Sequence, residues 1–177
     1  MPLTFSPPFQ IHQLNHLPLP DEDRQFLLTI GLPEDAIPCL TFQNAPGLPL
    51  RRVPERWGIS ESLKPSLMRY YEFGHDGGGN PICFDANDNC KIVWLDHEES
   101  FRSVWVNDHI TEFAACLAAL QDAFDGFEAA VGDTDALWDE GFEPERYEQL
   151  TAAFARIDEK TLTQGFWPYI LDDFRPR

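Results

Sequence analysis

Residues 70–85 read Tyr70-Tyr-Glu-Phe-Gly-His-Asp-Gly-Gly-Gly-Asn-Pro-Ile-Cys-Phe-Asp85, and residues 91–95 read Lys91-Ile-Val-Trp-Leu95. Apolar runs rich in aromatic and β-branched residues favour strands, and the glycine and asparagine turns between them favour reversals of the chain. We expect Ile82–Asp85 and Lys91–Leu95 to pair as a hairpin across Ala86-Asn-Asp-Asn89. Further strands are predicted at Leu67–Phe73 and Phe101–Val106, so the middle of the chain predicts an antiparallel sheet.

Helical patterns lie on both sides of the predicted sheet. Asp21–Ile30 has an acidic first turn and ends before Gly31. After the sheet, Asn107 or Asp108 is the expected cap of a helix whose apolar stripe contains Ile110, Phe113, Ala114, Leu117, Leu120 and Phe124. A further helix is predicted at Pro144–Ile157. This pattern indicates the α+β class, with a mostly antiparallel twisted sheet flanked by helices.

The remaining segments complete one predicted domain over residues 1–177. Five prolines in residues 1–20 predict an extended arm, and Cys39–Phe42 predicts a short strand. Residues 43–65 are rich in proline and glycine, which predicts a long irregular connection. Residues 125–177 are expected to form a helical, acidic C-terminal extension.

The chain is strongly acidic, because 30 Asp and Glu side chains against 13 Lys and Arg give a net charge of −17. Residues 1–120 contain 16 acids and 8 bases, whereas residues 121–177 contain 14 acids and 5 bases. A negative surface repels nucleic-acid phosphates and anionic lipid, and it attracts basic partners. It also keeps a protein soluble, so the charge alone leaves both interpretations open.

Two loops resemble binding motifs but lack their essential parts. Gly77-Gly-Gly79 has neither the lysine nor the spacing of a phosphate-binding loop and leads into a strand, so it is interpreted as a tight turn. Asp85-Ala-Asn-Asp-Asn-Cys90 begins like a calcium loop and has Asp96 at the twelfth place. Its sixth position is cysteine where a calcium loop needs glycine, and strands flank it. We therefore expect no metal and no cofactor.

The other polar side chains form no recognisable catalytic group. The five histidines include no HExxH pattern, and His97-Glu98-Glu99 has no nucleophile motif to accompany it. The acidic pairs Asp139–Glu140 and Asp172–Asp173 consist of neighbours, whose side chains diverge in a helix or strand. The sequence therefore predicts no catalytic residues and a protein that is not an enzyme.

The four cysteines, Cys39, Cys83, Cys90 and Cys116, have no CxxC or metal-ligand spacing and are expected to be buried free thiols. The first eight residues lack the basic and apolar regions of a signal peptide. No uncharged apolar run reaches the roughly 18 residues of a membrane span. We expect a protein of the reducing cytoplasm with no membrane span.

The order of these elements resembles the SUKH superfamily of bacterial immunity proteins over roughly Pro20 to Leu120. The parts that carry the resemblance are Phe26-Leu-Leu-Thr-Ile-Gly-Leu-Pro33, Tyr71-Glu-Phe-Gly74, Gly77-Gly-Gly79, Ile82-Cys-Phe-Asp85, Ile92-Val-Trp-Leu95, Val106-Asn107 and Ile110-Thr-Glu-Phe-Ala-Ala-Cys-Leu117. The Phe-Leu-x-x-x-Gly-Leu-Pro spacing and the asparagine before the Phe-containing helix are most similar to the fourth immunity clade. The residues after Asp125 show no such match.

The resemblance implies a non-catalytic protein that binds and neutralises a toxin, often one that acts on nucleic acid. A basic toxin cleft would be complementary to an acidic surface. The candidate partner-binding residues are Asp133, Asp135, Asp139, Glu140, Glu143 and Glu145. Two other classes stay open: a general adaptor of the same fold, which predicts a large exposed apolar patch, and a small-molecule enzyme, which predicts a deep polar pocket. The sequence does not specify the toxin or the oligomeric state.

Overall fold

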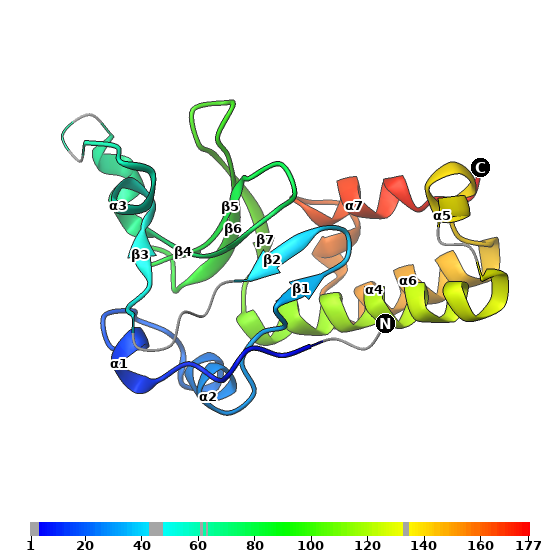
Figure 1. The fold of residues 1–177 in the computed structure, drawn as a ribbon, viewed down its shortest axis with the longest axis horizontal. Coiled ribbons are helices and arrows are strands. Elements are labelled where there is room, and N and C mark those ends of the chain that lie inside the picture. Colours follow the sequence, from blue (N-terminus) through cyan, green and yellow to red (C-terminus); the bar gives the residue numbers. More distant parts are fainter. Residues whose placement is uncertain (1–3, 43–47, 61, 63, 133–134) are drawn as a thin grey trace.

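The computed structural model describes residues 4–42, 48–60, 62, 64–132 and 135–177. Helices begin and end the chain, and strands occupy its middle (Figure 1). The elements before the main sheet strands are α1 (Ile11–Leu14), α2 (Asp21–Thr29), β1 (Asp35–Ala36), β2 (Leu40–Phe42), β3 (Arg51–Arg52), α3 (Val53–Trp57) and the 3₁₀ helix η1 (Pro65–Arg69). They are followed by β4 (Tyr70–His75), β5 (Pro81–Asp85), β6 (Lys91–Asp96), β7 (Arg102–Asn107), α4 (Ile110–Val131), α5 (Asp135–Glu140), α6 (Pro144–Ile157), η2 (Glu159–Leu162) and α7 (Trp167–Asp173). This arrangement confirms the α+β class.

The strands form one antiparallel sheet in the order β1-β2-β4-β5-β6-β7, and β3 also pairs with β4. The predicted hairpin is confirmed, because Asp85 of β5 lies opposite Lys91 of β6. A bulge interrupts β4 between Glu72 and Gly74. A Cβ atom at Gly74 would lie 2.5 Å from Cδ1 of Phe42, so only glycine lets β2 approach β4 this closely.

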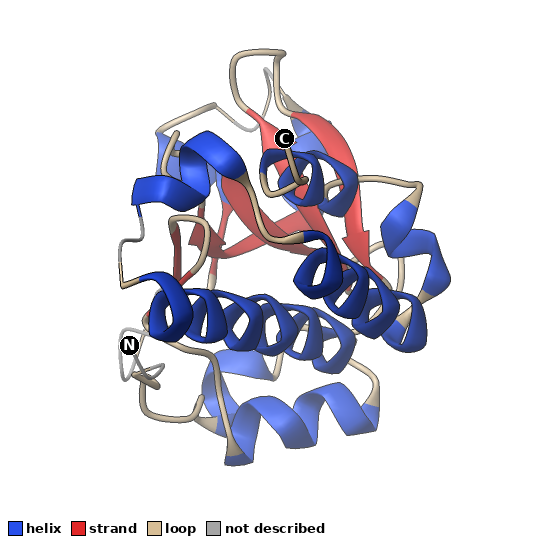
Figure 2. Ribbon diagram, turned by 90° about the vertical axis from the view of Figure 1, so that its right-hand side faces the viewer, coloured by secondary structure: helices blue, strands red, loops and turns tan. Residues whose placement is uncertain are grey.

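The main hydrophobic core lies between the sheet and α4, which carries the predicted apolar stripe. Phe73 of β4 contacts Phe113 of α4 with ring centroids 6.1 Å apart. Trp167 of α7 and Phe154 of α6 extend the same core, with their ring centroids 5.1 Å apart. Figure 2 shows this helical layer lying in front of the strands. The C-terminal helices therefore belong to the core of the domain.

The opposite face of the sheet is covered by α3 and η1. A smaller buried cluster lies there, made of Val53, Leu67, Tyr70, Cys83, Val93 and Leu95. The prediction that residues 43–65 are irregular is wrong for residues 51–57, which form β3 and α3. Pairing of Arg51 with Glu72 supplies backbone hydrogen bonds that the local sequence does not reveal. Leu67 lies in η1, so β4 begins three residues later than predicted.

The N-terminal arm packs against the domain and includes a helical turn where only extended chain was predicted. Phe9 donates a backbone hydrogen bond of 2.9 Å to the carbonyl of Leu27. Leu14 is fully buried, and the side chain of Gln13 donates to the carbonyl of Leu48 over 2.7 Å. Burial of apolar side chains thus fixes an arm whose prolines alone would leave it extended.

The helix caps differ in one place from the prediction. The cap of α4 is His109, whose backbone N–H donates to the Glu112 carboxylate over 3.2 Å. Asn107 and Asp108 precede the cap, and both make contacts elsewhere. The prediction that Asn107 or Asp108 caps this helix is therefore wrong. By contrast, α6 begins at Pro144 and ends at Ile157, as predicted.

Candidate protein-binding surface

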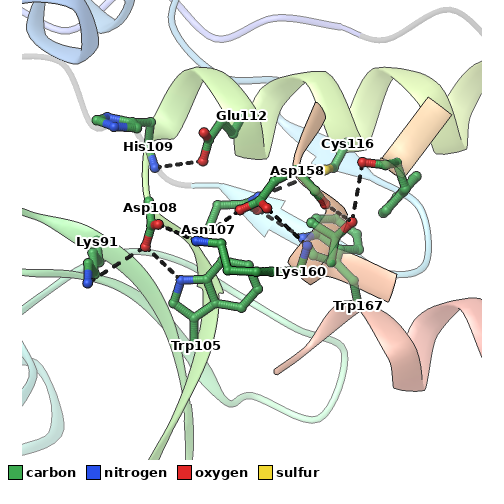
Figure 3. A network of polar contacts seen from close by, with 12 residues as sticks. Lys91, Trp105, Asn107, Asp108, His109, Glu112, Cys116, Asp158, Lys160 and Trp167 are labelled. Carbon is green, nitrogen blue, oxygen red and sulfur yellow. Dashed lines mark hydrogen bonds and ion pairs between the residues drawn. The ribbon is translucent and has the colours of Figure 1, made fainter. Parts of the chain in front are cut away.

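The C-terminal helices are joined to β7 by a network of polar contacts (Figure 3). The indole Nε1 of Trp167 donates to Oδ1 of Asn107 over 2.9 Å, and both residues are fully buried. The same asparagine donates through Nδ2 to the Cys116 thiol of α4, 3.9 Å away. Asn107 thereby links the last sheet strand to α4 and α7, and a buried amide of this kind specifies how the elements pack.

A second part of the network is ionic and surrounds Asp108. Its carboxylate accepts from the Lys160 ammonium of η2 over 2.5 Å and from the Trp105 indole over 3.0 Å. Lys91 lies 3.7 Å from the same carboxylate. Burial opposes the charge of Asp108, but the hydrogen bonds from Lys160 and Trp105 outweigh it and lower its pKa. Asp108 therefore stays ionised and holds η2 against the sheet.

The C-terminal residues in turn hold α5. Arg177 donates from its guanidinium to the carbonyls of Trp138 and Asp139, at 2.7 and 2.9 Å. Phe174 is fully buried, and its ring lies 5.3 Å from that of Trp138 between ring centroids. The helix has only six residues, so it depends on these tertiary contacts for its position.

The predicted partner-binding residues follow one another along this part of the chain. Asp133 lies outside the described residues. The other five are exposed: Asp135, Asp139 and Glu140 lie on α5, and Glu143 and Glu145 lie at the start of α6.

Two of these five acids have side-chain partners on α6. Glu143 forms an ion pair of 3.1 Å with Arg146, and its own backbone N–H and Arg146 lower its pKa. Glu145 accepts a longer hydrogen bond of 3.4 Å from Gln149. All five carboxylates of the segment are exposed to solvent, which an electrostatic contact with a partner requires.

The structure adds two exposed aromatic side chains to this acidic segment. Trp138 of α5 is 44% exposed and Tyr169 of α7 is 70% exposed, although both residue types usually bury most of their surface. Asp172 and Asp173 are exposed on the same helix as Tyr169, three and four residues further on. Figure 1 shows α5 and α7 together at one end of the molecule.

We call these residues the acidic aromatic surface: Asp135, Trp138, Asp139, Glu140, Glu143, Glu145, Tyr169, Asp172 and Asp173. Sequence reasoning missed Trp138 and Tyr169. The sequence did contain a signal for Trp138, because it is a lone tryptophan within an acidic run.

The two loops that resemble binding motifs have structural partners. In the glycine turn, Asp76 accepts hydrogen bonds from the backbone of Gly78 and Asn80 and from the Trp94 indole. Gly79 has a φ of +85°, as expected for a tight turn. In the calcium-like loop, Asp85 forms an ion pair of 2.5 Å with Arg69.

The described residues include no group of three or more His, Cys, Asp or Glu side chains placed to hold a metal. No helix among them is long and apolar enough for a membrane crossing.

The cysteines divide into two kinds. Cys83, Cys90 and Cys116 are buried free thiols, as predicted, and burial raises the pKa of Cys90 and of Cys116 to about 12. Cys39 is exposed, so the expectation of burial is wrong for this residue. It lies in the turn before β2, where its φ of +93° directs the chain into the strand.

Comparison with protein families matches residues 8–173 to the model of the SUKH-4 immunity protein. Comparisons with curated proteins and with solved structures found no match. The matched range includes all of α6 and α7, which corrects the expectation that the resemblance ends near Asp125. Burial of Trp167 against Asn107 gives the physical reason, because these helices complete the core. With nearly its whole length matched, the chain belongs to the SUKH-4 immunity protein family.

Proposed function

We propose that the chain neutralises a bacterial toxin by binding it through the acidic aromatic surface. Membership of an immunity family implies a toxin partner. The observation that supports this particular surface is the exposure of Trp138 next to Asp139 and Glu140 on α5, and of Tyr169 one helical turn before Asp172 and Asp173 on α7. Binding energy at protein interfaces concentrates in a few tryptophan, tyrosine and arginine side chains, and surrounding charges set partner choice and association rate.

The toxin that fits this surface is basic. A toxin that acts on nucleic acid presents lysine and arginine side chains to phosphates, and the same cleft attracts a carboxylate-rich surface. An immunity protein seated there would block the substrate by occupancy alone. This mechanism needs no catalytic residue, no cofactor and no nucleic-acid contact by the immunity protein. We place the protein in the cytoplasm, and the free thiols at Cys83, Cys90 and Cys116 suit that reducing compartment.

The experiment is coexpression with the polymorphic toxin encoded nearest to this chain, with growth rescue and co-purification as readouts. The test variant is Asp139→Lys with Glu140→Lys, which reverses two exposed charges of α5. The control is Glu34→Lys with Glu98→Lys, which changes the net charge equally at exposed positions outside this surface. We expect the native chain and the control to rescue, and the test variant to lose rescue while remaining folded.

Equal rescue by both variants would refute this surface as the toxin contact. A native chain that neither binds nor rescues would refute the immunity proposal itself. A chain that binds the toxin without rescue would favour the adaptor class, because an adaptor associates with a protein and leaves its activity intact.

A further inference from the structure

A groove on the other side of the molecule has the opposite charge character. Five of the thirteen basic residues lie in residues 51–69, where two residues are acidic, so this segment has a net charge of +3 in a chain of −17. The groove lies between α3 and β4 and is lined by Arg51, Arg56, Trp57, Glu72, His75 and Gly79. We call it the α3 groove. Figure 1 shows α3 and α5 at opposite ends of the long axis of the molecule.

The two described acids of α3 and β4 beside this groove, Glu55 and Glu72, are already paired. Glu72 is buried in its wall and forms an ion pair of 2.6 Å with Nε of Arg56. Burial raises the pKa of the Glu72 carboxyl, and Arg56 and Trp57 oppose this shift. Glu55 lies 4.0 Å from Arg52, whose Nε donates to the Tyr71 hydroxyl. These pairs leave one arginine, among the described residues that line the groove, without an acidic partner.

That arginine is Arg51, which is exposed directly opposite Glu72 in the β3–β4 pair. Its guanidinium has no hydrogen bond or ion pair with any other described residue. Arg56 is exposed beside it, and its ion pair with Glu72 is made through Nε. A guanidinium binds a carboxylate through two parallel hydrogen bonds, which makes the two arginines a suitable anchor for acidic side chains.

Trp57 supplies a rigid apolar platform beside these donors. Its indole Nε1 donates to Glu72 over 3.2 Å, and its ring lies 5.1 Å from Phe101 and 5.4 Å from His97 between centroids. The ring is nevertheless 38% exposed. Three contacts thus fix its orientation before any partner arrives, which lowers the entropic cost of binding.

The groove wall contains one polar atom that the described residues leave unsatisfied. Nδ1 of His75 is buried and has no hydrogen-bond partner among them. Buried polar atoms in folded proteins nearly always have a partner, but this atom lies below the groove surface and does not determine which occupant the groove takes.

We propose that the α3 groove binds an acidic peptide segment of a protein partner, with Arg51 and Arg56 on its carboxylates and Trp57 against its aliphatic stems. The strongly negative charge of the whole chain disfavours a nucleic acid, whose phosphates extend beyond this local basic region. A short acidic peptide, by contrast, contacts only the groove. The proposal does not depend on the toxin contact, because it concerns another end of the molecule.

The test is a titration followed by the indole ¹H–¹⁵N signal of Trp57, assigned with Trp57→Phe. The probe is hexaglutamate with both termini blocked. Hexaserine and inorganic phosphate are titrated separately for comparison. We expect a saturating shift with hexaglutamate alone. Arg51→Gln should weaken this binding by about tenfold or more, the effect of losing a charge-assisted hydrogen bond. The matched control is Arg156→Gln, an exposed arginine of α6, which should leave the affinity unchanged.

Three results would overturn the proposal. The first is an absence of any saturating shift of the Trp57 signal with hexaglutamate. The second is equal weakening by Arg51→Gln and Arg156→Gln, which would indicate attraction to net charge alone. The third is a shift by inorganic phosphate as strong as that by the peptide, which would make the groove a general anion site.

Discussion

Replacement of Trp167 by phenylalanine tests whether the C-terminal helices belong to the core. The side chain is fully buried in α7, and its indole Nε1 donates to Oδ1 of Asn107 over 2.9 Å. Phenylalanine keeps an aromatic ring but has no donor. The Asn107 oxygen then stays buried without its partner, because it lies inside the core where water does not replace the indole.

Two costs determine the size of the effect. A buried acceptor without its partner costs about 1–3 kcal/mol. The smaller ring leaves a cavity next to Phe113 and Phe154, which adds about 1 kcal/mol. The free energy of unfolding should therefore fall by about 2–4 kcal/mol. For a chain of this length, that loss lowers the melting temperature by roughly 4–16 °C.

The assay is urea unfolding followed by circular dichroism, with Tyr169→Phe as the control on the same helix. Tyr169 is 70% exposed, so its replacement should change the free energy of unfolding by less than about 0.5 kcal/mol. A Trp167→Phe cost within that same range would refute the reasoning, because α7 would then unfold separately from the sheet. A two-step transition in the native protein would refute it as well.

Two further predictions concern titration and thiol chemistry. The hydrogen bond with Asp23 raises the pKa of His109, so protonated His109 should stabilise the fold at acidic pH and lose this effect as the pH rises through the raised value. His109→Gln should thus destabilise the protein more at pH near 5.5 than near 8.5 in urea unfolding, and an equal loss at both would contradict this. Iodoacetamide should alkylate only exposed Cys39 in the native protein and all four cysteines in urea, as mass spectrometry would show. Native labelling of Cys90 or Cys116 would contradict their burial.

The sheet could be predicted because the residue pattern within its main strands indicates a strand without reference to distant parts of the chain. The hairpin of β5 and β6 joins two apolar runs across a short turn, so local sequence determines both its existence and its register. Helix α6 was also predictable, since Pro144 suits a first helical position and the apolar residues that follow recur at helical spacing. In both cases the residues that form the element also determine its limits.

Other elements depend on partners that lie far away in the sequence. The pairing of Arg51 with Glu72 forms β3 in a segment whose prolines and glycines favour turns. Asparagine is a residue type that often caps helices. The side-chain oxygen of Asn107 instead accepts a hydrogen bond from the indole of Trp167, sixty residues later in the chain. Local propensity cannot reveal such contacts, because the stabilising group comes from elsewhere in the chain.

The candidate surface was predictable only in its charge. Exposure of Asp139 and Glu140 follows from their chemistry, since unpaired carboxylates rarely lie in a core. Exposure of Trp138 depends on how Phe174 and Arg177 hold α5, and exposure of Tyr169 depends on how Trp167 positions α7 against Asn107. Whether this surface contacts a toxin stays a prediction, as does the expected role of Asp133, which lies outside the described residues.

The most direct test of the proposed function is the dissociation constant between the purified chain and the toxin domain encoded next to it, measured at low and high salt. We predict tight binding at about 50 mM NaCl that weakens sharply by about 500 mM, because exposed charges are screened over this range. Asp139→Lys with Glu140→Lys should reduce both the affinity and its salt dependence. Binding that is insensitive to salt and to these substitutions would contradict an acidic contact surface, and no binding at either salt concentration would contradict neutralisation by binding.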